Sequence, residues 1–234
     1  MSILPAAQKR LWPALRAAPR LGFVLYGGTA IALRLGHRRS VDFDFFTDKE
    51  LDRKALGSTF AFVRKATVLQ DERNALTVTV PSTEGPVKVS FFGGVDFGRF
   101  TEPEFTPDGV LQVACLDDLM ATKLKTILQR VESRDYRDIA AMIRAGVDLA
   151  KGLAIARAMF GTNFQPAVSL KTLTYFKGGD LDTLTADERS LLASAAAGVR
   201  DLPAVRRLSS QLFAGSVPRV PSRRGAVTAK AKPK

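Results

Sequence analysis

The sequence predicts an α/β fold (α+β) in which a mixed sheet with accompanying helices occupies the N-terminal half and helices alone form the C-terminal half. β-rich runs separated by polar turns fill residues 62–92, the pattern of a meander. After residue 115 the apolar residues recur at helical spacing instead. With 46% hydrophobic residues, the 234-residue chain can bury a sizeable core without metals or disulfides.

Strands and helices alternate along the N-terminal half. An amphipathic surface helix is expected over residues 8–18, and a short apolar strand over 23–26 ends in a tight turn at Gly27 and Gly28. Thr29 then caps a helix over 29–35. The elements expected after it are a strand over 41–46, a helix over 48–56 and strands over 62–69, 75–80 and 87–92.

Helical periodicity governs the second half of the chain. Helices are expected over 116–130, 137–144, 149–159, 186–197 and 202–213. We therefore predict a core domain over 1–114 and a helical domain over 115–217 packed on it, because the junction has little linker character. Residues 218–234 are rich in Pro, Lys and Arg, which predicts a disordered basic tail or, alternatively, an arm that contacts RNA.

The net charge of +12 indicates a phosphate-bearing substrate or RNA, or alternatively ordinary solubility charge. Setting aside the six basic residues of 218–234 leaves 29 basic against 23 acidic residues, or +6. The single cysteine, Cys115, excludes an intramolecular disulfide and fits a reducing compartment. Basic residues interrupt every apolar stretch near the N-terminus, so we expect a cytoplasmic protein with no signal peptide and no membrane association.

The strongest chemical signal is the acidic strand at Asp42 and Asp44. Alternate side chains of a strand share a face, so both carboxylates point the same way, about 7 Å apart at Cα. Two carboxylates so placed repel unless a cation lies between them, and Mg²⁺ prefers such oxygen ligands. The alternative is a surface strand whose aspartates face water.

The turn at Gly27, Gly28 and Thr29 supplies the other half of such a site. Glycines let a phosphate approach the backbone closely, and the start of the next helix offers free N–H groups. Together with the acidic strand, the turn predicts a bound nucleoside triphosphate. The expected reaction is in-line attack by an acceptor hydroxyl on the α-phosphorus with release of pyrophosphate.

A second constellation lies between Lys123 and Asp138. In one continuous helix Lys123, Arg130, Arg134 and Asp138 would share a stripe that binds phosphates. Ser133 could instead start a new helix, and Arg134 with Asp138 could be a solvated ion pair.

The polar loop before the acidic strand carries His37, Arg38 and Ser40, which would lie near the phosphates. His37 is the only histidine and cannot form a zinc site alone, so phosphate contact and a structural role both stay open.

These motifs resemble those of the AbiEii/AbiGii-type toxin nucleotidyltransferases, in the polymerase-beta-like nucleotidyltransferase superfamily. Residues 26–46 resemble the first motif of the family, and 123–139 resemble its later motif, a lysine helix followed by Arg-Asp-x-x-Asp. Residues 170–176 are also similar to members of this group.

The resemblance implies a nucleotidyltransferase core that uses Mg²⁺ and an NTP, with a tRNA 3′ end as the acceptor in some toxin members and a cognate antitoxin as partner. It implies catalytic roles for Asp42, Asp44, Lys123 and Asp138, with Asp42 and Asp44 on the metal and Asp135 as a further candidate. The residues expected to bind the nucleotide are Gly27, Gly28, Thr29, His37, Arg38, Ser40 and Arg134.

One departure from the family pattern concerns Ser90. The family often carries Lys-x-Asp on a later strand, and the matching stretch here is Lys88-Val89-Ser90. Either Asp138 or Asp96 supplies the third carboxylate, or the activity is weakened. The alternative function is therefore a nucleotidyltransferase-fold protein that binds nucleotide or RNA without efficient catalysis, and a third possibility is transfer of the γ-phosphate.

Overall fold

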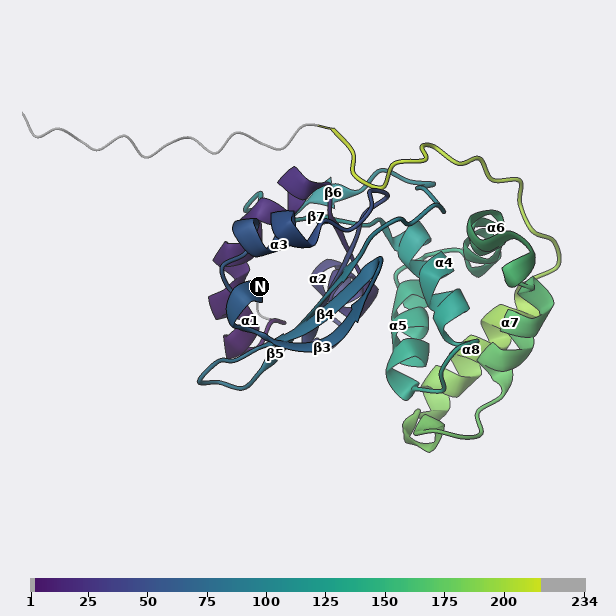
Figure 1. Cartoon of the computed structure of the whole chain (residues 1–234). Coiled ribbons are helices and arrows are strands. Elements are labelled where there is room, and N and C mark those ends of the chain that lie inside the picture. Colours follow the sequence, from purple (N-terminus) through teal and green to yellow (C-terminus); the bar gives the residue numbers. More distant parts are fainter. Residues whose placement is uncertain (1–2, 216–234) are drawn as a thin grey trace, which may run out of the picture.

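The computed structural model describes residues 3–215, and it confirms the α/β fold with a mixed sheet followed by helices (Figure 1). Seven strands form one sheet in the order β3-β4-β5-β2-β1-β7-β6. The strands are β1 (Val24–Tyr26), β2 (Asp42–Phe46), β3 (Thr67–Glu72), β4 (Ala75–Val80), β5 (Val87–Phe92), β6 (Glu104–Phe105) and β7 (Gln112–Val113).

The acidic strand β2 lies inside the sheet, antiparallel to β1 and parallel to β5. Its register places Asp42 beside Lys88 and Asp44 beside Ser90. Phe43 and the other inward side chains of β2 are fully buried, as the alternation in the sequence predicts. The opposite face of β2 is left to the carboxylates.

The helices of the first half are α1 (Ala6–Leu11), the 3-10 helix η1 (Trp12–Leu21), α2 (Gly27–Leu35) and α3 (Arg53–Thr59). The helix expected over 8–18 is therefore α-helical only to Leu11. Pro13 and Pro19 lack the N–H that α-helical bonding needs, which explains the tighter winding. The helix expected over 48–56 begins later, since the Asp52 side chain accepts a hydrogen bond from the Ala55 amide and caps α3 there.

The strand expected over 62–69 is shifted toward the C-terminus. A 3-10 turn, η2 (Val63–Lys65), precedes β3, which continues to Glu72. The reason is the hairpin with β4, whose register pairs Glu72 with Ala75 and leaves only two residues in the turn.

The second half consists of α4 (Leu116–Thr126), α5 (Ser133–Arg144), α6 (Leu149–Phe160), α7 (Pro166–Thr174) and α8 (Ala186–Gly198), with 3-10 turns η3 (Gly161–Asn163) and η4 (Leu181–Thr183). Figure 1 shows these helices grouped beside the sheet half. Helix α2 packs against both α4 and α5, so it joins the two halves. None of the helices within residues 3–215 is long and apolar enough to cross a membrane.

The prediction of a helix over 202–213 is wrong. Pro203 interrupts the pattern, and the segment instead runs back to the sheet half, as Figure 1 shows. The Arg99 amide donates to the Ser209 carbonyl at 2.9 Å, and the Leu208 amide donates to the Arg99 carbonyl at 2.9 Å. Leu212 is fully buried there. The tail predicted over 218–234 lies outside the described residues.

Asp118, near the start of α4, is a buried carboxylate away from the cleft. Its oxygens accept hydrogen bonds from the Phe100 amide and the Thr101 hydroxyl, both at 3.1 Å. Burial raises the pKa of Asp118 to about 6. Because this is above the pKa of the unfolded chain, the folded state gains stability when Asp118 is protonated, and that gain is lost as the pH rises through about 6.

We predict that Asp118→Asn makes the free energy of unfolding less dependent on pH. Relative to wild type, the variant should gain up to about 3 kcal/mol between pH 4 and pH 7.5. Urea unfolding at both pH values measures this change. Asp187→Asn, at an exposed position in α8, is the control. A difference from wild type that does not vary with pH would contradict the role of Asp118.

Candidate active site

The acidic strand faces a cleft between β2, α4, α5 and the loop that precedes β2. One part, the basic lobe, has a volume of ≈ 90 Å³ and is lined by Gly28, Arg38, Arg39, Ser40, Val41, Asp42, Asp44, Lys88, Lys123, Arg130 and Arg134. The other part, the aromatic lobe, has a volume of ≈ 270 Å³ and is lined by Tyr26, Gly27, Gly28, Asp44, Phe46, Phe92, Thr122, Lys123, Thr126, Gln129 and Arg130. The residues common to both lobes are Gly28, Asp44, Lys123 and Arg130.

Asp42 and Asp44 project into this cleft from one face of β2, as predicted from the alternation. Burial, and then the negative charge of Asp42, raise the pKa of Asp44 above its ordinary value. The repulsion between the two carboxylates is what a cation between them would relieve. The pair therefore has the chemistry of a Mg²⁺ site, because this ion is commonly held by one or two carboxylates together with substrate phosphates.

The two glycines that begin α2, Gly27 and Gly28, leave space for neighbouring side chains of the site. Gly27 has φ +71°, and a Cβ on it would lie 2.4 Å from Asp44 Oδ2. A Cβ on Gly28 would lie 2.3 Å from Arg38 Nη2. The Arg38 guanidinium is thus held against the start of α2, where the first backbone N–H groups of the helix are free.

Thr29 is placed differently from the prediction. It is buried and does not cap α2, which starts at Gly27. Its hydroxyl donates to the Asp42 carbonyl and lies 2.8 Å from Ser40 Oγ. Thr29 therefore ties α2 to the acidic strand, while Ser40 beside it lines the basic lobe.

Asp138 is fully buried at the back of the cleft and is surrounded by cations. It accepts hydrogen bonds from Arg38 Nε at 2.6 Å and Nη2 at 2.8 Å, and its oxygens lie 2.7 Å from His37 Nε2 and 2.8 Å from Lys123 Nζ. Burial alone would raise the pKa of Asp138, but the hydrogen bonds from His37 and Arg38 and the charge of Lys123 hold it well below its ordinary value. With its oxygens so occupied, Asp138 positions Lys123 and Arg38 instead of replacing the third carboxylate.

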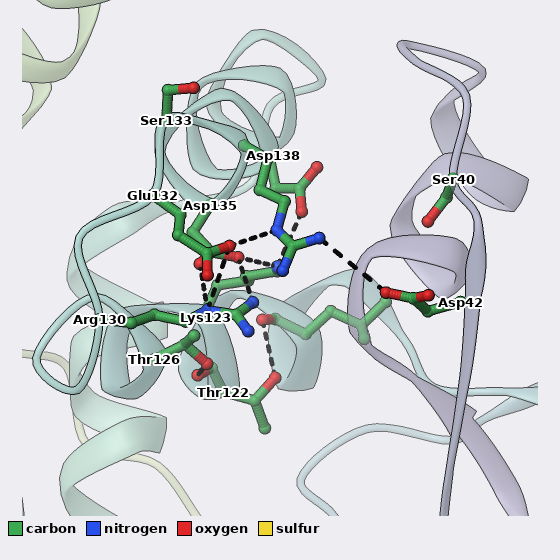
Figure 2. Close-up of polar contacts among 12 residues, drawn as sticks. Ser40, Asp42, Thr122, Lys123, Thr126, Arg130, Glu132, Ser133, Asp135 and Asp138 are labelled. Atoms are coloured by element: carbon green, nitrogen blue, oxygen red, sulfur yellow. Dashed lines mark hydrogen bonds and ion pairs between the residues drawn. The ribbon is translucent and has the colours of Figure 1, made fainter. Parts of the chain in front are cut away.

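Asp135 is the second buried anion of this network. It accepts hydrogen bonds from Lys123 Nζ and from Arg130 Nε at 2.7 Å. Lys123 is thus held between Asp135 and Asp138 at the wall of both lobes. Figure 2 shows this cluster on α4 and α5 opposite Asp42.

The stripe from Lys123 to Asp138 is not one helix. Helix α4 ends at Thr126 and α5 starts at Ser133, whose amide and hydroxyl donate to Asp180 at 2.6 and 2.7 Å. Arg134 lies one turn before Asp138 in α5 but does not pair with it, because the oxygens of Asp138 bind Arg38, His37 and Lys123. It pairs with Glu132, and its Nη1 lies 3.9 Å from Asp42 Oδ2.

Three predicted positions differ in how close they lie to the cleft. Arg134 lines the basic lobe. His37 lines neither lobe but reaches the site through Asp138. Asp96 is exposed beyond the end of β5 and lines neither lobe, so it does not supply a third carboxylate here.

Lys88 is a site residue that the sequence reasoning did not select. Its Nζ lies 3.3 Å from Asp42 Oδ2, across the β2–β5 pair. The sequence did contain one signal for Lys88. Lys88 and Ser90 are two residues apart, as are Asp42 and Asp44, so each pair lies on one face of its strand. Only the register of β2 against β5 shows that the two pairs lie side by side, with Lys88 next to Asp42 and Ser90 next to Asp44.

We predict that Asp138→Asn lowers the free energy of unfolding by about 3 kcal/mol, because it removes the acidic partner of the partly buried Arg38 and leaves the buried Lys123 with Asp135 alone. Glu132→Gln is the matched control, since its partner Arg134 is solvent-exposed and such pairs contribute about 0–1 kcal/mol. Urea unfolding monitored by circular dichroism compares the two. If both variants lost the same free energy of unfolding, the buried ion pairs would matter no more to stability than the partly exposed pair of Glu132 and Arg134.

A protein-family model described as nucleotidyl transferase AbiEii toxin, type IV TA system, matches residues 10–210. An uncharacterized protein of Aquifex aeolicus (strain VF5) is 28% identical over 158 residues, covering 66% of this chain and 74% of the relative.

Two solved structures match the chain at low sequence identity. The nucleotidyltransferase toxin MenT4 from Mycobacterium tuberculosis H37Rv has a TM-score of 0.53 at 17% identity, covering 83% of this chain and 91% of that one. The antibiotic-resistance factor ANT(2″)-Ia has a TM-score of 0.47 at 13% identity, covering 65% and 90%. Because the family match spans most of the chain, and the sheet carries the acidic strand that the family resemblance implies, the protein belongs to the AbiEii nucleotidyltransferase toxin family.

Proposed function

We propose that this nucleotidyltransferase uses Mg²⁺ to transfer a nucleoside monophosphate from an NTP to an RNA acceptor, such as a tRNA 3′ end, with release of pyrophosphate. The observation that carries the proposal is the placement of Asp42 and Asp44 opposite a cluster of cations in one cleft. A metal site beside concentrated positive charge suits a polyphosphate substrate better than a neutral one.

The basic lobe would hold the β- and γ-phosphates. Arg38 offers its guanidinium beside the start of α2, and Arg134 and Lys88 both lie within 4 Å of Asp42 Oδ2, at 3.9 and 3.3 Å. A Mg²⁺ ion held by Asp42 and Asp44 would neutralise phosphate charge as pyrophosphate leaves. Lys123, fixed by two buried aspartates, would add a positive charge at the junction of the lobes, where the α-phosphate would lie.

The aromatic lobe would receive the acceptor. In-line displacement requires the acceptor to approach from the side opposite to the leaving pyrophosphate, and this lobe adjoins Asp44 on the side away from Arg38 and Arg134. The rings of Phe46 and Phe92, whose centroids are 4.9 Å apart, offer a surface on which an RNA base could stack.

The family description of a type IV toxin–antitoxin system supports a cognate antitoxin as a partner. Since NTPs and tRNA are the proposed substrates, we place the reaction in the cytoplasm. The tRNA acceptor rests on the resemblance to toxin members of the family.

The proposal is tested with the purified full chain, Mg²⁺, each α-³²P-labelled NTP in turn and total tRNA. We expect label on RNA. Asp42→Ala should lower the rate of transfer by more than about 100-fold, since mutating residues that only support the metal ligands already costs roughly 10–100-fold. Asp96→Ala, the exposed aspartate, is the control and should retain activity. Label recovered only as NDP, which is the labelled product that transfer of the γ-phosphate would leave, or no label on RNA from a folded sample, would refute nucleotidyl transfer to RNA.

A further prediction concerns Gly27, which makes room for Asp44. Gly27→Ala should lower transfer by about 100-fold, because a displacement of about 1 Å at a catalytic group is enough for such a loss. Gly36→Ala is the matched control, since Gly36 also has a positive φ, +66°, at the other end of α2 but has no atom within 4 Å of the added Cβ. Both variants should lose about 1 kcal/mol of stability through the left-handed backbone. Equal transfer activity in the two variants would contradict the claim that Gly27 is needed to leave space for Asp44.

A further inference from the structure

We propose that the site binds one divalent cation rather than two, and that the Lys88 ammonium supplies the second positive charge beside the acidic strand. This inference rests on the proposed function. It is carried by the oxygen atoms that face the cleft, by Ser90, and by the place of Lys88 in the register of the sheet.

The first step is the number of carboxylates that are free to bind metal. Sites with two metal ions place them about 3.5–4 Å apart, with carboxylate oxygens shared between them. Among residues 3–215 only Asp42 and Asp44 turn carboxylates into the cleft, because Asp135 and Asp138 are paired with cations such as Lys123 and Arg130. Within residues 3–215, no group of three or more His, Cys, Asp or Glu side chains could hold a metal ion.

The second step is Ser90, which stands where a third carboxylate would be expected. It pairs with Asp44 in the β2–β5 register and is only 3% exposed. Its hydroxyl oxygen accepts a hydrogen bond from the Thr77 hydroxyl at 3.4 Å. Ser90 therefore contributes a neutral, already bonded oxygen on the β5 side of the acidic pair.

The third step is the positive charge on the β5 side of the acidic pair, which comes from Lys88. Lys88 pairs with Asp42 in the same register, and its Nζ lies 3.3 Å from Asp42 Oδ2. Among the described residues its sole ion-pair partner is Asp42, and its side chain is 40% exposed at the wall of the basic lobe. The ammonium has three donors, so it can hold Asp42 and still bind an oxygen of the substrate.

On its β5 side the site thus has two carboxylates beside one ammonium, that of Lys88. A second divalent cation on the β5 side would lie beside the Lys88 ammonium and would find no third acidic ligand. Replacing Ser90 with an acid should supply that ligand.

The test counts Mn²⁺ bound to the full chain by electron paramagnetic resonance, with a saturating NTP analogue whose α,β-bridging oxygen is a methylene group. Analogue without protein provides the background. We expect one Mn²⁺ per chain for wild type and for the control Ser90→Ala, and two for Ser90→Asp. Two Mn²⁺ per chain in wild type, or one in a folded Ser90→Asp, would overturn the proposal.

A second measurement addresses Lys88 and does not depend on how Ser90→Asp folds. Lys88→Ala should still bind one Mn²⁺ but transfer NMP roughly 10-fold or more slowly, and Lys88→Arg should recover part of that loss. Unchanged transfer in Lys88→Ala would overturn the role of Lys88. A wild type that binds one Mn²⁺ with the analogue but labels no RNA would refute the proposed function and leave the cation count standing, so the two failures are distinguishable.

Discussion

The ion pairs of Lys123 with Asp135 and Asp138 hold together the segments that line the cleft. Both aspartates are fully buried on α5, Lys123 comes from α4, and Asp138 also binds Arg38 from the loop before the acidic strand. Three separate segments are therefore joined by one set of charges. Buried ion pairs often add little net stability because desolvation offsets their attraction, so the main effect of this network is to position Lys123 and Arg38.

The same network decides which charges are left for a ligand. Asp135 and Asp138 neutralise part of the positive charge of Lys123, Arg38 and Arg130, while other cations of the basic lobe, such as Lys88, remain half-exposed beside the acidic pair. The cleft thus presents metal-binding carboxylates and phosphate-binding cations side by side. Gly27 and Gly28 at the start of α2 allow these side chains to lie so close, since a methyl group at either position would collide with Asp44 or with Arg38.

Prediction from sequence succeeded where local geometry is sufficient. The alternation of β2 placed Asp42 and Asp44 on one face because side chains of a strand have a period of two. It failed where distant segments compete for the same groups. Thr29 bonds to the backbone of β2 instead of capping α2, and residues 202–213 pair with Arg99 instead of forming a helix. Local spacing also could not show what Asp138 contacts, because its oxygens bond to His37 and Arg38, about 100 residues away; its catalytic role stays a prediction.

The sequence by itself determined the α/β order of the elements, the acidic strand, the glycine turn and the family resemblance, because these depend on residue type and short spacing. The tertiary structure alone decided which charges meet. The parallel pairing of β2 with β5 brought Lys88 to Asp42 and Ser90 to Asp44, and the break between α4 and α5 turned Lys123 toward both buried aspartates. Strand register and helix packing arise from burial of the whole core, so no local pattern could have specified these contacts.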